Sequence, residues 1–423
     1  MDSLTYFIEG ILTAICIYVL LRNVLDKDKS KLWEPINVIS LVYLYYCTMP
    51  VFFNEGRYVI NSTMRPYLCD LGALLSYLCL IWGYNRSTTK EFTKWNVLFT
   101  SKNCMYLGIG LFVIGLACYV PFRGFATSIS YSEGVGDDYN RDGFTSYFIG
   151  MISLFCGSCS LVIMSFKEKK NIYSLIIIWL SFITYIVGGF RFRLVALLFA
   201  ILIPVYLYPK IKKPNYVVLA VIAFVAYLGF AVMDKARVYG QGIDFSKVTE
   251  MSFDDASKGA QENEAVYYYS VLCMDDIEER SDYKFFDPLI NAALMPIPRS
   301  LFPWKPKGDY MASVMKSTLG STDSGAASMM FVEAFLSFGW IGIIVFFYLI
   351  GWFSKVVWDN YHKNQGSIGA ILFLSLFDGF LYTLMSRGYL AQSFVTYMYY
   401  VILPFWFSTL ILKMFGKKTN QAQ

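Results

Sequence analysis

Charged residues are scarce in this sequence. Only 16% of the 423 residues are Asp, Glu, Lys or Arg, whereas 56% are hydrophobic and the mean hydropathy is +0.47. A soluble domain of this size carries more charge. Several uncharged runs approach the roughly 20 residues that cross a bilayer as a helix. The composition therefore indicates an all-α protein that crosses the membrane many times.

Signatures of nucleotide chemistry are also absent. The chain has neither a P-loop nor the glycine pattern of a dinucleotide-binding fold, which argues against ATP and cytosolic activated sugars as substrates. We expect no nucleic-acid partner. Most of the nine cysteines fall inside apolar runs, so we interpret them as small core residues rather than as a redox framework.

Eleven apolar runs predict eleven transmembrane helices. Residues 1–21 lack a basic start and a small-residue cleavage site, so we expect the first helix to be retained. The predicted spans are 4–21, 36–53, 67–84, 104–121, 147–166, 172–189, 192–208, 216–233, 329–353, 367–385 and 389–412.

Every second connection between these runs is rich in lysine, which fixes the expected orientation. The positive-inside rule makes these connections cytoplasmic, with the N-terminus outside and the C-terminus inside. Residues 1–233 then carry helices 1–8, residues 234–328 form a long outer loop, and residues 329–423 carry helices 9–11 and a cytoplasmic tail. The lysine-rich connections are 22–35, 85–103, 167–171, 209–215, 354–366 and the tail after 412.

Arginine is distributed differently from lysine. With this topology 10 of the 12 arginines lie outside, against 7 of the 24 lysines. Arginine offers a planar fork of donors suited to phosphate and carboxylate, whereas lysine is a point charge. Arg191 and Arg193 stand together in a short hairpin between two apolar runs. We therefore expect an outer site that binds a polyanion.

Acidic residues inside the predicted helices point to the same face. Glu333 and Asp378 lie in the outer halves of their helices, where acids usually face a bundle interior or a watery cavity. Glu9 and Asp70 lie nearer to helix ends, and we interpret them as interfacial. The only histidine, His362, falls in a cytoplasmic connection, so a base on the outer face must be a carboxylate, a tyrosine or the substrate.

The long loop 234–328 has two parts. Residues 248–280 read as a polar helix, and the acids Asp275, Asp276, Glu278 and Glu279 within it fit a solvated face better than a metal site. Four prolines between 296 and 306 then exclude a regular helix. This strap is expected to lie on the membrane surface and to hold Arg299 and Lys305 at headgroup level.

Four short stretches between about residues 180 and 400 stand out by their order and spacing. The stretches are Tyr185-Ile-Val-Gly-Gly-Phe-Arg191, Lys235-Ala-Arg237-Val-Tyr239-Gly240, Ile297-Pro-Arg-Ser-Leu-Phe-Pro-Trp-Lys305-Pro, and Ser386-Arg387-Gly388 with Ser393-Phe394. Together they resemble bacterial O-antigen polymerases (Wzy), in particular the enterobacterial common antigen polymerase branch.

The resemblance implies a GT-C-like membrane glycosyltransferase in the bacterial inner membrane. Such an enzyme transfers glycan from an undecaprenyl-diphosphate-linked oligosaccharide donor to a second lipid-linked unit, without a metal or other cofactor. Membrane lipid and a polysaccharide chain-length regulator are further candidate partners. The implied catalytic arginines are Arg191, Arg237 and Arg387, and Glu333 or Asp378 is the candidate base. Arg193 and Arg299, which match no family stretch, join Lys305, Lys235 and Tyr239 as expected substrate-binding residues.

Two other functions stay open. An O-antigen ligase shares this architecture, but that resemblance leads us to expect an outer-face histidine, which the predicted topology does not provide. A transporter of lipid-linked glycans usually shows internal repeats and short loops, whereas this sequence shows no repeat and one loop of 95 residues.

Overall fold

The fold of the described residues is helical. One pair of two-residue strands, β1 (Arg237–Val238) and β2 (Gly242–Ile243), pairs antiparallel. Seven helices are long and apolar enough to cross a membrane, and three shorter apolar helices accompany them. These features confirm a polytopic helical membrane protein. The computed structural model describes residues 3–53, 64–86, 99–128, 150–166, 172–188, 191–209, 211, 215, 217, 237–238, 242–243, 262–297, 301–302 and 327–419.

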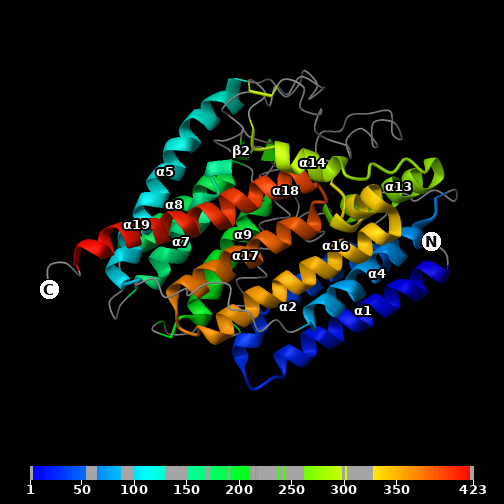
Figure 1. Cartoon of the computed structure of the whole chain (residues 1–423), viewed down its shortest axis with the longest axis horizontal. Coiled ribbons are helices and arrows are strands. Elements are labelled where there is room, and N and C mark those ends of the chain that lie inside the picture. The colour runs from blue at the N-terminus through cyan, green and yellow to red at the C-terminus, as the bar shows by residue number, and fades with distance from the viewer. Residues whose placement is uncertain are drawn as a thin grey trace.

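The helices follow one another along the chain as Figure 1 labels them. The first group is α1 (Ser3–Val24), the short 3-10 helix η1 (Lys29–Trp33), the continuous span α2–η2–α3 (Pro35–Tyr43, Leu44–Thr48 and Met49–Phe52) and α4 (Pro66–Tyr84). The second group is α5 (Ser101–Ser128), α7 (Leu154–Met164), α8 (Ile172–Val187) and α9 (Arg191–Leu207). After the strands come α13 (Glu262–Arg280), α14 (Asp287–Leu294), α16 (Met330–Lys363), α17 (Ile368–Ser386) and the span α18–η3–α19 (Leu390–Tyr397, Met398–Ile402 and Leu403–Thr419).

Most of the predicted helices are present. Ten of the eleven expected spans coincide with these helices, and the eleventh, 216–233, lies almost wholly outside the described residues. The helix expected at 248–280 is described from Glu262 onward as α13. Residues 298–300 and 303–306 of the proline-rich strap lie outside the described residues. The cysteines are free thiols, buried except for the half-buried Cys118, which confirms them as core residues.

Helix α17 lies at the centre of the bundle, and 94% of its apolar membrane-spanning stretch is buried. Close backbone contacts bring its neighbours together. A Cβ atom on Gly351 of α16 would lie 2.0 Å from the carbonyl oxygen of Leu80 in α4. Only glycine permits that approach, and small residues at crossings are the usual means of packing helices in lipid. The α4–α16 pair therefore forms one rigid edge of the bundle.

The outside of the bundle is strongly apolar. Trp179 on α8 and Trp406 on α19 are each 68% exposed, and Tyr18 on α1 is 65% exposed. An apolar surface of this kind would aggregate in water, but it is the normal outer surface of a protein in lipid.

Helix α16 is broken near its start. Phe338 and Gly339 have non-helical backbone angles, so the segment 330–337 turns away from the long span that follows. The break releases backbone carbonyl groups. One of them, on Leu336, accepts a hydrogen bond from the backbone N–H of Lys284 at 2.8 Å. The connection between α13 and α14 is thereby attached to the membrane-spanning body.

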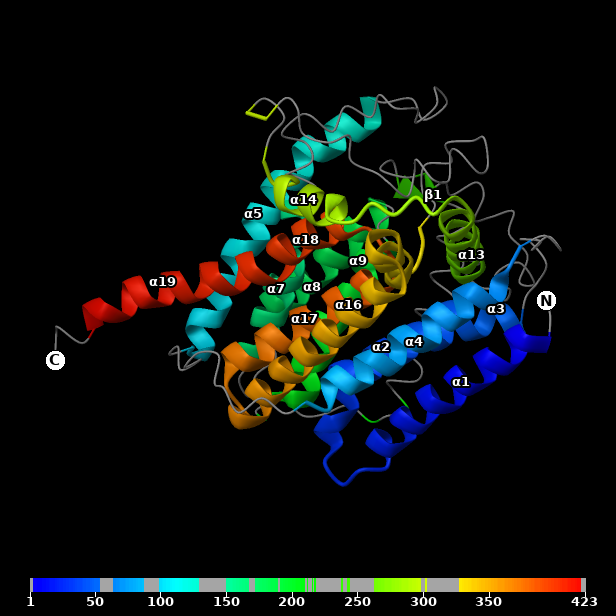
Figure 2. The same ribbon diagram turned by 45° about the vertical axis from the view of Figure 1, so that its right-hand side comes forward.

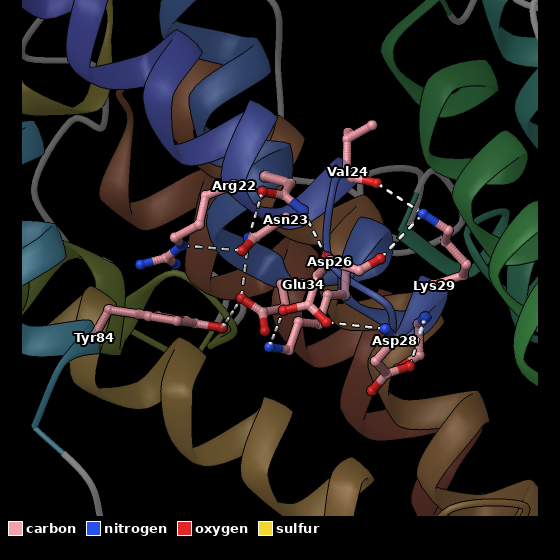
Figure 3. Close-up of polar contacts among 11 residues, drawn as sticks. Arg22, Asn23, Val24, Asp26, Asp28, Lys29, Glu34 and Tyr84 are labelled. Carbon is pink, nitrogen blue, oxygen red and sulfur yellow. Dashed lines mark hydrogen bonds and ion pairs between the residues drawn. The ribbon is translucent and has the colours of Figure 1, made fainter.

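The lysine-rich end of the bundle is built from local contacts, which Figure 3 shows around the turn from α1 to α2. The amide of Asn23 donates to Glu34 at 3.2 Å and to Asn37 at 2.9 Å, and the hydroxyl of Tyr84 donates to Glu34 at 3.4 Å. Lys31 pairs with Asp26 at 2.6 Å. The ion pair at this end is therefore local in sequence, whereas the hydroxyl of Tyr84 joins the turn to α4.

Candidate functional site

Two arginines from distant parts of the sequence lie against one aromatic ring. The guanidinium carbon of Arg193, in the first turn of α9, is 5.4 Å from the ring centre of Phe192. The guanidinium carbon of Arg387, which follows α17, is 4.9 Å from the same ring centre. Each distance is within the range of a cation–π contact. We call Arg193 and Arg387 the arginine pair. The structure thus brings two predicted site residues together.

Arg387 also forms an ion pair with the segment between helices α9 and α16. Its Nη2 donates to Oε1 of Glu262 at 2.7 Å, with the two side chains only 24% and 16% exposed. Glu262 is the first residue of α13 and lies 125 positions away in the sequence. The hydroxyls of Tyr46 and Tyr382 are 2.9 Å apart, and Tyr46 interacts electrostatically with Glu262. A charged and hydroxyl-rich cluster therefore adjoins the arginine pair.

The turn Ser386-Arg387-Gly388 fixes where Arg387 lies. The N–H of Gly388 donates to the carbonyl of Ser328 at 2.6 Å. A Cβ atom at Gly388 would lie 2.4 Å from the carbonyl oxygen of Met329, so the turn and the start of α16 are in backbone contact. The glycine of this motif is therefore a packing requirement, and the arginine before it is held at a set position.

Glu333 supports the same turn. It is 1% exposed, and its Oε2 accepts a hydrogen bond from the backbone N–H of Leu390, the first residue of α18. A carboxylate at a helix N-terminus satisfies an unpaired donor and is favoured by the helix dipole. The structure thus places this candidate base beneath the Arg387 turn, where it holds the start of α18.

Asp378 lies apart from the arginine pair. It is fully buried in the middle of α17, and neither of its carboxylate oxygens has a hydrogen-bond partner among the described residues. Arg387 follows nine residues later, which corresponds to about 13 Å along a helix axis. The structure does not bring this candidate base next to the arginines.

The remaining predicted residues are described partly or not at all. Arg191 begins α9 and Arg237 begins β1, but their side chains lie outside the described part of the chain. Strand β2, which pairs with β1, contacts α8, the helix that precedes Arg191. The backbone of Arg237 is thus near the end of the bundle that carries the arginine pair. Lys235, Tyr239, Arg299 and Lys305 all lie outside the described residues.

Helix α13 is attached to the bundle by three further polar contacts. The hydroxyl of Tyr267 donates to Asp70 at 2.7 Å, and the N–H of Met329 donates to the hydroxyl of Ser270 at 2.9 Å. Arg65 pairs with Asp275, and this hydrogen bond raises the pKa of the Arg65 guanidinium. Figure 2 shows α13 at the ends of α3 and α4, and α14 alongside α18.

The acids near this end are buried rather than interfacial. Glu9 and Asp70 are both fully buried, and they lie close enough to interact with each other through hydrogen bonding. Thr48 donates to Glu9 at 3.4 Å. The interfacial interpretation of these two acids is therefore wrong, because Asp70 is covered by Tyr267 of α13 and Glu9 is enclosed beside Thr48 and Asp70. Asp275 and Asp276 also differ from the expected solvated face, since each pairs with an arginine and is less than one-fifth exposed.

Comparison with known proteins decides the family. A model of the O-antigen polysaccharide polymerase Wzy family matches residues 71–419. The chain belongs to this family. No match was found among curated proteins or solved structures.

Membership of the Wzy family makes the chain an O-antigen repeat-unit polymerase of the inner membrane, a glycosyltransferase-like enzyme that acts on lipid-linked oligosaccharides. The match includes the arginine pair, Glu262 and Glu333, and it begins after Glu9 and Asp70. Assignment to the enterobacterial common antigen branch stays a prediction.

Two residues of this Wzy site are missing from the prediction. Phe192 lies between Arg191 and Arg193 in the sequence. That position is the one feature of the sequence that could have indicated an aromatic ring beside the arginines. Glu262 begins a polar helix that contains several other acids, and nothing in the sequence distinguishes it from them. Among the described residues, no group of three or more His, Cys, Asp or Glu side chains is placed to hold a metal ion.

Proposed function

We propose that this polymerase joins repeat units on the outer face of the cytoplasmic membrane. The donor is an undecaprenyl-diphosphate-linked oligosaccharide, and the acceptor is a second lipid-linked unit. The lysine-rich end of the bundle faces the cytoplasm, and the end that carries α13 and α14 faces outward. The architecture is GT-C-like, and a chain-length regulator is a separate partner in the membrane.

The arginine pair carries this proposal. When the glycosidic bond breaks, its electron pair stays on the diphosphate oxygen, and negative charge grows on the leaving group. Preorganised donors stabilise such charge, and one donor is worth roughly 3 kcal/mol in a site that excludes water. Arg193 is 8% exposed and Arg387 is held by its turn. Both guanidinium groups are therefore oriented before substrate arrives.

Arg191 and Arg237 complete the clamp in this proposal. Arg191 begins α9 two residues before Arg193, and β1 pairs with β2, which contacts α8. Lys235, Tyr239, Arg299 and Lys305 contribute contacts to the lipid-linked substrate. Because arginine binds phosphate with two parallel hydrogen bonds, several arginines on different elements can surround one diphosphate.

The acceptor step needs a proton acceptor. The acceptor hydroxyl oxygen bonds to the sugar carbon that leaves the diphosphate, and its proton passes to a carboxylate. Glu333 is the better placed of the two candidates because it adjoins the Arg387 turn. Asp378 lies deeper, in the middle of α17.

The experiment that tests this function uses purified protein in nanodiscs. It is incubated with synthetic undecaprenyl-diphosphate-linked repeat units, without nucleotide or metal. A ladder of lipid-linked polymers supports the proposal. Transfer that occurs only when lipid A core is added indicates a ligase, and the absence of any new glycosidic bond contradicts polymerisation.

A further inference from the structure

The arginine pair places two positive charges close together in a half-buried position. Both guanidinium groups contact the ring of Phe192, and Arg193 is buried. Like charges in such surroundings repel each other more strongly than in water. A nearby anion is therefore needed when no substrate is bound. Glu262 meets this need, because its carboxylate accepts a hydrogen bond from Arg387 at 2.7 Å.

A carboxylate and a phosphate offer the same kind of surface to an arginine. Each presents two oxygens to the parallel donors of a guanidinium group. A diphosphate carries more charge than a single carboxylate, so it competes for Arg387 at an advantage. Glu262 consequently occupies the position that the proposed function gives to the substrate.

The place of Glu262 in α13 lets its side chain leave without loss of the helix. It is the first residue of α13. The rest of the helix is held by two hydrogen bonds and one ion pair. Tyr267 donates to Asp70, Ser270 accepts from the N–H of Met329, and Asp275 pairs with Arg65. These contacts begin more than one turn beyond Glu262, so the Glu262 side chain can leave Arg387 while the rest of α13 stays attached.

We propose that Glu262 is an exchangeable counter-ion, which the diphosphate of the lipid-linked substrate displaces from Arg387 and which returns when undecaprenyl diphosphate leaves. This inference rests on the proposed function, because it requires Arg387 to bind the diphosphate. The exchange weakens binding of the by-product and thereby speeds its release. Glu262 therefore lowers the affinity of Arg387 for any phosphate ligand that must displace it.

The test compares binding of undecaprenyl diphosphate and undecaprenyl phosphate to four proteins in nanodiscs: wild type, Glu262→Gln, Glu262→Asp and the control Glu279→Gln. Glu279 is exposed on the same helix. The expected Kd of Glu262→Gln for undecaprenyl diphosphate is about 5-fold lower than that of wild type. The Kd for undecaprenyl phosphate should fall by a similar factor, because both ligands displace the same counter-ion. Glu262→Asp lies between, and the control equals wild type.

Turnover gives a second readout. Glu262→Gln should lower KM and kcat together, because by-product release slows. If the substitution only damaged the folded structure, kcat would fall and KM would not. An unchanged or higher Kd in Glu262→Gln overturns the exchange. If this variant unfolds, Glu262→Asp decides, since its Kd must also fall.

Arg387→Gln separates the two hypotheses. Unchanged binding in that variant contradicts the proposed function, whereas weaker binding together with no gain in Glu262→Gln contradicts only the exchange.

Discussion

The two ends of the bundle hold their charges in different ways. At the lysine-rich end, Lys31 pairs with Asp26 and Lys355 pairs with Asp359, within five residues of each other in the chain. At the arginine-rich end, ion pairs join parts of the chain that are far apart. Arg387 reaches Glu262 across 125 residues, and Arg65 reaches Asp275 across 210.

This difference separates two roles of charge in a membrane protein. Local lysine pairs need no particular fold, and exposed pairs of this kind contribute little to stability. Long-range arginine pairs depend on the fold and hold α13 against the membrane-spanning helices. Local pairs such as Arg280 with Asp276 also occur on α13. The arginine-rich end is therefore where substitution should change function.

The largest effect is expected from Arg387→Lys. The charge remains, but the planar fork that contacts Phe192 and would bind phosphate is lost. Activity should fall on the order of 100-fold, the usual cost of losing one well-placed donor. The lipid-linked polymer ladder measures it. The matched control is Lys355→Arg at the other end, which should keep a normal ladder. Equal effects at both ends would contradict the comparison.

A smaller loss is expected from Gly388→Ala. The added methyl group meets the carbonyl of Met329 at 2.4 Å, and the turn must shift. Such overpacking costs about 1–3 kcal/mol and displaces Arg387. Thermal unfolding and ladder length measure the two consequences. Gly110→Ala is the control because a Cβ atom there meets nothing within 4 Å. A fall in melting temperature as large in the control would show that the contact with Met329 is not responsible.

Asp275→Asn should have a modest effect on the attachment of α13. The side chain of Arg65 is 37% exposed, so the ion pair is worth about 1 kcal/mol or less. Limited proteolysis should cut α13 somewhat faster, and the double variant with Arg65→Gln should add nothing further. Additive effects of the two substitutions would show that this pair does not hold the helix.

The smallest effect is expected at Glu34, in the lysine-rich end. Burial raises the pKa of its carboxyl above the usual 4.5. A raised pKa means that folding takes up a proton, so stability is greater at low pH and declines as pH rises through the folded-state pKa. Glu34→Gln should remove this decline and leave activity unchanged. Melting temperature against pH measures it, and an identical pH profile for the variant would contradict the assignment.

The sequence predicts the helices better than the site. Ten spans are recognisable because their length and apolarity meet the thickness of a bilayer. The turn at Arg387 is recognisable because Ser386-Arg387-Gly388 is one of the four stretches that resemble the family. Glu262 is not, since its partner lies 125 residues away and the neighbouring acids look alike in the sequence. The break at Gly339 and the burial of Asp70 beneath α13 also depend on tertiary contacts that no local pattern encodes.

The most direct test of the central claim is phosphorus NMR of undecaprenyl diphosphate bound to the purified protein in nanodiscs. The resonances should shift on binding to wild type. That shift should be lost in Arg193→Gln and in Arg387→Gln, and it should persist in Lys355→Gln. If both arginine variants instead show the same shift on binding as wild type, the diphosphate binds elsewhere, and that result would contradict the account.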